Sequence, residues 1–199
     1  MVKFLKIIYY WLATSLVAVV SFIFYPCRVY GRENIPKKGG CIYASNHESN
    51  IDPVLLPVAS PRQMRFMAKE ELFRNPILGW LIRTGGGFPI RRATADRGAL
   101  NEFLHQLKLG YPVLIFPQGT RGGKKIQSGV GFLAVTSGVP VVPIFIDGTA
   151  HVLPKGSKVP KRTPVKVIFG KPFTLPSGMS YDAAAGEVMA AISALAPKK

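Results

Sequence analysis

His47 and Asp52 are the side chains whose types and spacing could do chemistry in this sequence. His47 follows a short apolar run, residues 41–44, which lies between glycines and polar residues and is typical of a buried strand. Asp52 precedes Pro53, and this pair predicts a helix start with Asp52 as the N-cap. A histidine at a strand end and an aspartate at the next helix start, five positions apart, can meet across the turn between them.

The pair suits general-base activation of a hydroxyl group. A neutral imidazole accepts a proton near neutral pH, and a carboxylate fixes its tautomer and stabilises the imidazolium. The chain has no G-x-S-x-G motif, so His47 is not expected to activate a serine of the protein, and the substrate would bring the hydroxyl. A simpler interpretation stays open, in which His47 forms a hydrogen bond in a turn and Asp52 only caps a helix.

A glycine-rich segment, residues 84–92, ends in Arg91 and Arg92. Glycines allow unusual dihedral angles and close backbone approach, and two guanidinium groups at a strand end suit a phosphate. The glycines match neither G-x-G-x-x-G nor a P-loop, so a dinucleotide site is not predicted. The alternative is that both arginines are only solvated surface charges.

The strongest strand pattern, residues 112–116, runs into a second basic loop that contains Gln118, Gly119, Thr120 and Arg121. A buried strand that ends in glycine, threonine and arginine is how an α/β protein forms an anion site at the carboxyl edge of its sheet. The loop therefore predicts a second group of phosphate ligands.

Three other polar residues are weighed as site or surface residues. Lys69 follows a further strand candidate, residues 65–68, and so stands at its carboxyl end. His105 lies beside the apolar face of an amphipathic helix and is interpreted as a surface residue. His151, in a loop after residues 139–146, could approach the site.

Size, charge and cysteine content limit the possible classes of protein. At 199 residues, with 48% hydrophobic residues and a mean hydropathy of +0.21, the chain fits one folded domain. Lys and Arg outnumber Asp and Glu by 26 to 10, and the net charge of +16 predicts an anionic partner: nucleic acid, an anionic membrane or a phosphorylated substrate. Cys27 and Cys41 suggest neither a disulfide framework nor a metal site, and no metal is expected.

Residues 7–25 contain no charged side chain and are flanked by basic residues on both sides. A helix of this length spans roughly 30 Å, the thickness of a bilayer core, and aromatic residues occur near both ends. A cleavable signal peptide is the alternative, but no small-x-small site precedes Pro26. We therefore expect a membrane-anchoring segment, residues 1–28, that either spans the bilayer or lies in its interface, followed by a catalytic domain, residues 29–199.

Strand and helix patterns alternate along the rest of the chain, which predicts an α/β domain. We expect a mixed, mostly parallel central sheet flanked by helices and preceded by the hydrophobic amino-terminal anchoring helix. Residues 139–146 read as a buried strand whose two prolines favour a place at the edge of the sheet or an irregular course. A last strand at 165–169 and an Ala-rich helix at 181–195 complete the pattern.

Four blocks in this order, residues 46–52, 86–92, 116–121 and 139–144, resemble the glycerolipid acyltransferase family, most closely the bacterial 1-acylglycerol-3-phosphate acyltransferases. The resemblance covers about residues 29–175. It implies transfer of a fatty acyl group from acyl-CoA or acyl carrier protein to the sn-2 hydroxyl of lysophosphatidic acid, giving phosphatidic acid. No cofactor is implied beyond the acyl donor, which is a co-substrate.

The resemblance also implies roles for individual residues. His47 becomes the general base and Asp52 its orienter. The acceptor phosphate would be held by residues of the basic loops and by Lys69, namely Lys69, Arg91 or Arg92, Gly119, Thr120 and Arg121. One departure is Gln118, where the family usually has Glu: a neutral amide can still contact the acceptor but cannot supply a charge.

The implied place of action is the cell membrane, with the catalytic domain on the cytoplasmic face against anionic phospholipid. Another glycerolipid or phosphorylated acceptor is an alternative substrate. A basic membrane-surface or nucleic-acid-binding module is the alternative of another class, but the sequence lacks the exposed aromatic or recognition-helix pattern of such modules, so nucleic acid is not an expected partner. Acyl-chain length and the choice of donor do not follow from the sequence.

Overall fold

The computed structural model of the chain describes residues 10, 12, 15, 26–90, 95–119, 123, 126–152, 154, 159 and 161–197, and of residues 95–97 only the backbone. Within these residues the strands are β1 (Cys27–Tyr30), β2 (Cys41–Ser45), β3 (Arg65–Lys69), β4 (Gly87–Ile90), β5 (Pro112–Ile115), β6 (Val141–Asp147) and β7 (Val165–Phe169). The helices are η1 (Arg32–Asn34), α2 (Asp52–Ala59), η2 (Glu70–Arg74), α3 (Pro76–Thr84), α4 (Ala95–Lys108), α5 (Gly129–Ser137), α6 (Thr149–Val152) and α7 (Tyr181–Ser193).

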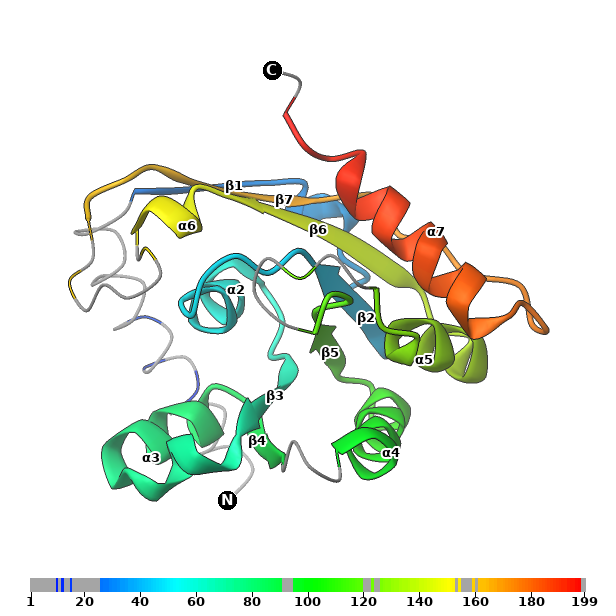
Figure 1. Cartoon of the computed structure of the whole chain (residues 1–199), viewed down its shortest axis with the longest axis horizontal. Helices are drawn as coiled ribbons and strands as arrows, with labels where there is room; N and C mark the ends of the chain where they lie inside the picture. The colour runs from blue at the N-terminus through cyan, green and yellow to red at the C-terminus, as the bar shows by residue number, and fades with distance from the viewer. Residues whose placement is uncertain are drawn as a thin grey trace.

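The strands form one twisted sheet in the order β1-β7-β6-β2-β5-β3-β4 (Figure 1). β6, β2, β5, β3 and β4 run parallel to one another, whereas β7 pairs antiparallel with β6 and β1 pairs parallel with β7. The predicted mixed, mostly parallel sheet is therefore confirmed. Five strands that run in one direction deliver the residues after them to a single edge of the sheet.

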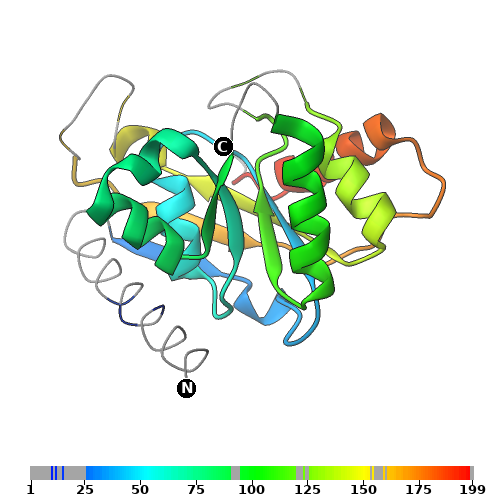
Figure 2. The same cartoon turned by 90° about the horizontal axis from the view of Figure 1, so that it is seen from below.

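The sheet is covered on both faces, and β2 at its centre shows why. Successive side chains of a strand point to opposite faces, so Cys41 and Tyr43 pack with apolar residues of α2, whereas Ile42 and Ala44 pack with apolar residues of α4, α5 and α7. All five residues of β2 are buried. Figure 1 and Figure 2 show α4, α5 and α7 together on one side, with α2 across the sheet from them and α3 beside β4. The site thus follows a strand buried on both faces.

The prediction that prolines push residues 139–146 to an edge of the sheet or into an irregular course is wrong, because β6 is a continuous strand. β6 lies inside the sheet, between β7 and β2. Pro143 is tolerated there because the β6–β7 register ends at the pair Ile144 and Phe169, so the missing N–H of Pro143 falls just beyond the ladder. The carbonyl of Pro143 still accepts a hydrogen bond from the backbone N–H of Gly170 at 2.8 Å.

The start of α2 also differs from the prediction. Ile51 is the N-cap and Asp52 is the first residue of the helix, so Asp52 is not the cap. Its carboxylate instead points back to the preceding loop, where it accepts two backbone hydrogen bonds. The residue types were read correctly, but the side chain serves the loop that carries His47 rather than the helix.

Most of the predicted anchoring segment, residues 1–28, lies outside the described residues, which include only Tyr10, Leu12, Ser15 and residues 26–28 of it. Tyr10 is buried, and its hydroxyl donates a hydrogen bond to the carbonyl of Pro57 in α2 at 3.4 Å. None of the helices in the described part of the chain has the length and apolar character needed to cross a membrane.

Candidate active site

The candidate site lies at the carboxyl edge of the parallel strands. The segment after β2 carries His47, the segment after β5 carries Gln118 and Gly119, and Lys69 is the last residue of β3. These strands are neighbours in the sheet, in the order β2-β5-β3, so residues far apart in sequence leave the sheet side by side. The topology therefore brings the predicted base and part of the predicted anion site to one edge.

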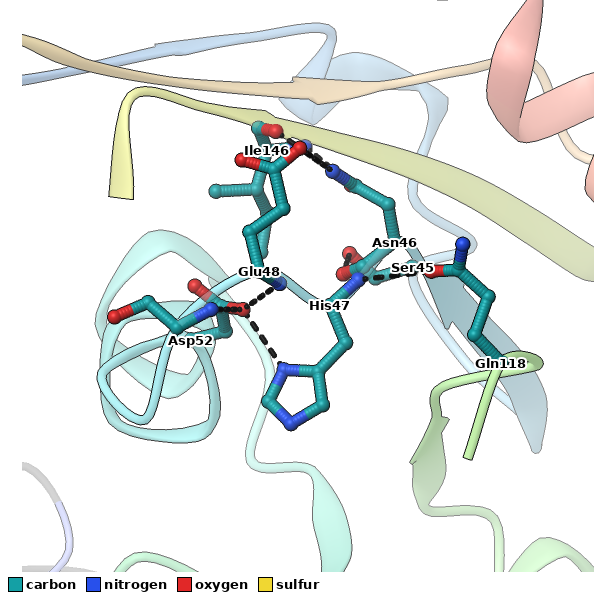
Figure 3. A network of polar contacts seen from close by, with 8 residues as sticks. Ser45, Asn46, His47, Glu48, Asp52, Gln118 and Ile146 are labelled. Carbon is teal, nitrogen blue, oxygen red and sulfur yellow. Dashed lines mark hydrogen bonds and ion pairs between the residues drawn. The ribbon is translucent and has the colours of Figure 1, made fainter. Parts of the chain in front are cut away.

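Asn46 fixes the start of the loop that carries His47. Its Nδ2 donates to the carbonyl of Ile146 at 2.8 Å, and its Oδ1 accepts from the backbone N–H of Ile146 at 2.7 Å (Figure 3). The backbone register between β2 and β6 ends at Ser45 and Ile144, so the amide side chain extends the contact between the two segments past the end of the ladder. The buried Asn46 thus sets the direction in which the chain leaves β2.

Asp52 orients the imidazole of His47. Its Oδ2 lies 2.8 Å from His47 Nδ1 and accepts from the backbone N–H groups of Glu48 and Ser49, also at 2.8 Å. An ionised carboxylate only accepts hydrogen bonds, so Nδ1 carries the imidazole proton and Nε2 keeps its lone pair. Asp52 is fully buried, so the three donors replace water around Oδ2. This is the arrangement of a general base with its orienter.

Phe116, just after β5, limits the movement of the His47 ring. The two rings stack with their centroids 4.1 Å apart and an interplanar angle of 22°. The His47 side chain keeps 15% of its surface exposed, and Figure 3 shows Nε2 on the side of the ring that faces away from Asp52. Nε2 is therefore the nitrogen that a substrate hydroxyl can reach.

Gln118 contacts the backbone of His47 rather than its ring. Its Oε1 accepts a long hydrogen bond from the His47 N–H at 3.4 Å, which links the loop after β5 to the loop after β2. A neutral amide is sufficient for this contact because the acceptor is a single oxygen. The predicted contact of Gln118 with the acceptor substrate stays a prediction.

Glu48 follows His47 in the chain, and its pKa is raised. Burial is the main factor that raises the pKa of Glu48 above its ordinary value, and the nearby charge of Asp52 raises it further. Asp147 also raises this pKa, whereas a hydrogen bond from Asn46 and the proximity of His151 lower it.

The predicted anion site is described only in part. Lys69 is exposed at the carboxyl end of β3, paired in register with Ile90, the residue before Arg91. Gly119 is exposed and adopts a φ of 66°, which glycine reaches without strain. The other predicted phosphate ligands lie outside the described residues: Arg91, Arg92, Thr120 and Arg121.

His105 is exposed on α4, as predicted for a surface residue. Within the described residues, no group of three or more His, Cys, Asp or Glu side chains could hold a metal ion. Burial raises the pKa of Cys27 and of Cys41 to about 11, which leaves both as unreactive thiols.

Sequence reasoning did not assign roles to Asn46, Phe116 and Glu48. The available signal was position alone: Asn46 is the first polar side chain after the serine that ends the buried strand, and Phe116 ends the apolar run before the second basic loop. Their partners lie 100 and 69 positions away in sequence, so the contacts depend on the order of strands in the sheet.

The fold and the site together define an α/β protein with a histidine–aspartate pair at the carboxyl edge of a mostly parallel sheet. The family model described as Acyltransferase matches residues 26–147, and the chain belongs to that family. The resemblance found in the four sequence blocks is thereby confirmed.

Individual relatives support the same family assignment. The chain is 31% identical over 172 residues to the chloroplastic 1-acyl-sn-glycerol-3-phosphate acyltransferase BAT2 of Brassica napus, over 82% of this chain and 50% of that protein. It is 31% identical over 148 residues to the 1-acyl-sn-glycerol-3-phosphate acyltransferase of Bacillus subtilis, over 73% of this chain and 72% of that protein. The chain thus spans about half the length of the plant relative and more of the bacterial one.

A solved structure has the same fold. The 1-acyl-sn-glycerophosphate acyltransferase PlsC from Thermotoga maritima superposes with a TM-score of 0.69 and 27% sequence identity, over 98% of this chain and 82% of that one. The α/β architecture and the family assignment therefore agree.

Proposed function

We propose that this chain transfers a fatty acyl group from acyl-CoA or acyl carrier protein to the sn-2 hydroxyl of 1-acyl-sn-glycerol 3-phosphate, forming phosphatidic acid. The observation that carries the proposal is the position of His47, whose Nδ1 is held by Asp52 at 2.8 Å while Nε2 faces away from it. The acceptor class is supported by the names of the relatives and by the net charge of +16, which favours a phosphorylated lipid.

The proposed reaction is a direct transfer without an acyl-enzyme. His47 Nε2 takes the proton of the acceptor hydroxyl while its oxygen attacks the thioester carbonyl carbon, and a C–O bond forms. Backbone N–H groups near the strand ends stabilise the negative charge on the tetrahedral oxygen. The C–S bond then breaks, and the leaving thiolate takes up the proton from the imidazolium, so the base is regenerated.

Basic residues position the acceptor in this proposal. The phosphate would be bound by Lys69, Arg91 or Arg92, Gly119, Thr120 and Arg121, and Gln118 would contact the acceptor nearby. Charged hydrogen bonds of this kind act in the ground state and the transition state alike, so they serve binding more than the chemical step. Removal of the charge at Arg121 is therefore expected to raise the KM for the acceptor more than it lowers kcat.

The proposed place of action is the cytoplasmic face of the cell membrane. The uncharged segment 7–25 would anchor the chain, and the basic catalytic domain would lie against anionic phospholipid. Both substrates fit this place, because the acceptor is a membrane lipid and the donors occur in the cytoplasm.

The test is release of free thiol from a long-chain acyl-CoA by detergent-solubilised protein, with and without lysophosphatidic acid. Thiol release is expected to require the acceptor, and His47→Ala should lower it by about 10²- to 10⁴-fold. His105→Ala is the matched control, because His105 is exposed on α4 and is expected to leave the rate unchanged. The two thiols of the protein should add little background at neutral pH, because the pKa of each is raised to about 11.

Substantial turnover by His47→Ala would contradict its role as the base. Without release from acyl-CoA, the same assay is repeated with acyl carrier protein as donor and then with glycerol 3-phosphate, other lysophospholipids and aminolipids as acceptors. Failure of all combinations would contradict the proposal. In that case, steep loss of nucleic-acid binding with rising salt would favour the basic-module alternative.

A further inference from the structure

The outer side of α3 and η2 exposes large apolar side chains. Ile77 is 73% exposed and Trp80 is 52% exposed on α3, and Leu78 beside them and Leu72 on η2 are each 39% exposed. Single exposed apolar residues are ordinary, but these four lie on two consecutive short helices. We call these four residues, Leu72, Ile77, Leu78 and Trp80, the α3 surface.

The packing of α3 explains why this side stays uncovered. Gly79 is the buried residue of the helix, and a Cβ at Gly79 would come within 3.0 Å of the backbone of Phe73 in η2. Ile82, at another position around the helix, lies against Gly87 and the core. At about 100° per residue, Leu78, Ile77 and Trp80 occupy an arc of about 160° away from these contacts. These three side chains are therefore exposed on the side of the helix that faces away from η2 and the core.

We propose that the α3 surface is a docking surface for an anionic lipid bilayer, separate from the amino-terminal segment. Tryptophan prefers the membrane interface, where its apolar ring is buried and its N–H stays near polar groups. α3 carries no acidic residue, and Arg74 and Arg83 flank its apolar side chains. Arg83 lies over the Phe73 ring at 4.9 Å from the centroid, so its charge is held beside the surface.

Charge favours a bilayer over a second copy of the chain as the occupant. Each chain has a net charge of +16, so two copies repel one another, whereas anionic headgroups attract the arginines that flank the surface. The acidic residues nearby, Glu70 and Glu71, precede Leu72 at the start of η2, so the positive charge lies at the other end of the surface, with Arg74 and Arg83.

The α3 surface is connected to the edge of the sheet that carries the candidate active site. η2 begins directly after Lys69, which stands at the carboxyl edge where the candidate active site lies. Figure 1 and Figure 2 both show α3 on the side of the molecule opposite α5 and α7. A bilayer bound at α3 would therefore approach the carboxyl edge of the sheet from the side opposite α5 and α7. It would leave α7 in water. The docking itself does not depend on the acyl-transfer chemistry.

Trp80 is itself the reporter that tests the proposal. The sequence has two tryptophans, so Trp11→Phe in the full chain leaves Trp80 as the single emitter. On addition of phosphatidylglycerol vesicles, its emission should shift to shorter wavelength, and lipids with brominated acyl chains should quench it. The matched control is a variant that combines Trp11→Phe, Trp80→Phe and Tyr181→Trp, so that its single tryptophan lies at the start of α7. Tyr181 is 46% exposed, so a tryptophan there should remain open to aqueous iodide.

Three results would overturn the proposal. Trp80 could stay open to iodide and unquenched by brominated lipid while the chain sediments with the vesicles. It could be shielded from iodide before vesicles are added, which would indicate a second copy at this face. Quenching equal in phosphatidylcholine and phosphatidylglycerol vesicles would contradict the anionic partner. Because no substrate is present, none of these results depends on whether the proposed acyl transfer is correct.

A second variant connects the surface to function. Ile77→Asp places a carboxylate in the most exposed apolar position of α3, where it removes no core contact. If the proposed acyl transfer holds, this variant should lose activity on acceptor embedded in anionic vesicles and keep it on acceptor in detergent micelles. Unchanged activity on the vesicles would contradict a docking role, and equal loss in both assays would indicate damage to the fold, in which case the fluorescence result decides.

Discussion

The side-chain amide of Asn46 and the backbone of Ile146 form a reciprocal pair of hydrogen bonds, 2.8 and 2.7 Å long, between residues 100 positions apart. The pair joins the segment after β2 to β6 at the point where their backbone ladder has ended. The next residue along the chain is His47. The position of His47, the proposed base, therefore depends on a contact made by its neighbour.

Asn46→Asp is expected to lower both stability and kcat. The carboxylate has no donor for the carbonyl of Ile146 and repels it, and a buried group left without its partner typically costs about 1–3 kcal/mol in the free energy of unfolding. Chemical denaturation and kcat at saturating substrates measure the two effects. Asn34→Asp is the control, because Asn34 Nδ2 donates to the carbonyl of Phe169 at 2.9 Å, away from the site. A loss of stability with unchanged kcat in Asn46→Asp would show that Asn46 supports only the fold.

Asp52→Asn is expected to preserve the fold and remove most of the activity. The asparagine oxygen can still accept from the backbone N–H groups of Glu48 and Ser49, and its NH₂ can occupy the place of Asp52 Oδ1, which is buried and lacks a hydrogen-bond partner among the described residues. The negative charge that stabilises the imidazolium is lost, so kcat should fall by about 10²- to 10⁴-fold.

Circular dichroism and thermal unfolding of Asp52→Asn should stay close to those of the unmodified chain, and the KM for the acceptor should change little. If the variant unfolds at a clearly lower temperature, the fall in kcat reflects loss of the fold and does not test the role of the charge. In that case Asp52→Glu, which keeps the charge, should restore part of the activity if the carboxylate is the orienter.

The order of elements and the pairing of His47 with Asp52 could be predicted because both depend on short stretches of sequence. The apolar run before His47 and the Asp–Pro pair after it lie within thirteen residues. The mostly parallel sheet followed from the alternation of strands and helices. The predicted N-cap was wrong because propensity identifies a residue type at a helix start, not the direction of its side chain.

The contacts around the base could not be predicted because they depend on which strands are neighbours. Phe116 meets His47 only because β5 lies next to β2, and Asn46 meets Ile146 only because β6 lies on the other side. The place of Pro143 inside the sheet has the same cause, since its missing N–H is harmless only where β7 ends. Strand order is set by packing over the whole domain, and periodicity in one segment does not report it.

Phe116→Leu is expected to lower kcat with little change in KM. The centroids of the Phe116 and His47 rings lie 4.1 Å apart in the stack. Leucine keeps an apolar contact with the imidazole but not the stacked ring that limits its rotation. Aromatic pairs contribute about 0.5–1.5 kcal/mol beyond buried area, which corresponds to roughly a two- to tenfold loss in kcat if the ring position is the only effect. Phe116→Tyr retains the ring and should restore the rate. Equal losses in the two variants would contradict a role for stacking.

Glu48→Gln is expected to change the pH dependence of stability. The pKa of Glu48 is raised in the folded chain, chiefly by burial and then by the charge of Asp52. The folded chain therefore holds the Glu48 proton more tightly than the unfolded chain does. The free energy of unfolding accordingly falls as pH rises from the ordinary glutamate pKa of 4.5 through the raised value. Glutamine does not ionise, so the variant avoids this loss.

Thermal unfolding between pH 4 and pH 7 measures the effect. Glu48→Gln should have a higher Tm than the unmodified chain at pH 7, and the difference should shrink toward zero as pH falls below 4.5, where Glu48 is protonated in both states. Glu33→Gln is the control, because Glu33 is an exposed residue of η1 and its replacement should give the same Tm difference across the range. A Tm difference for Glu48→Gln that does not vary with pH would mean that the variant acts through a contact and not through the charge.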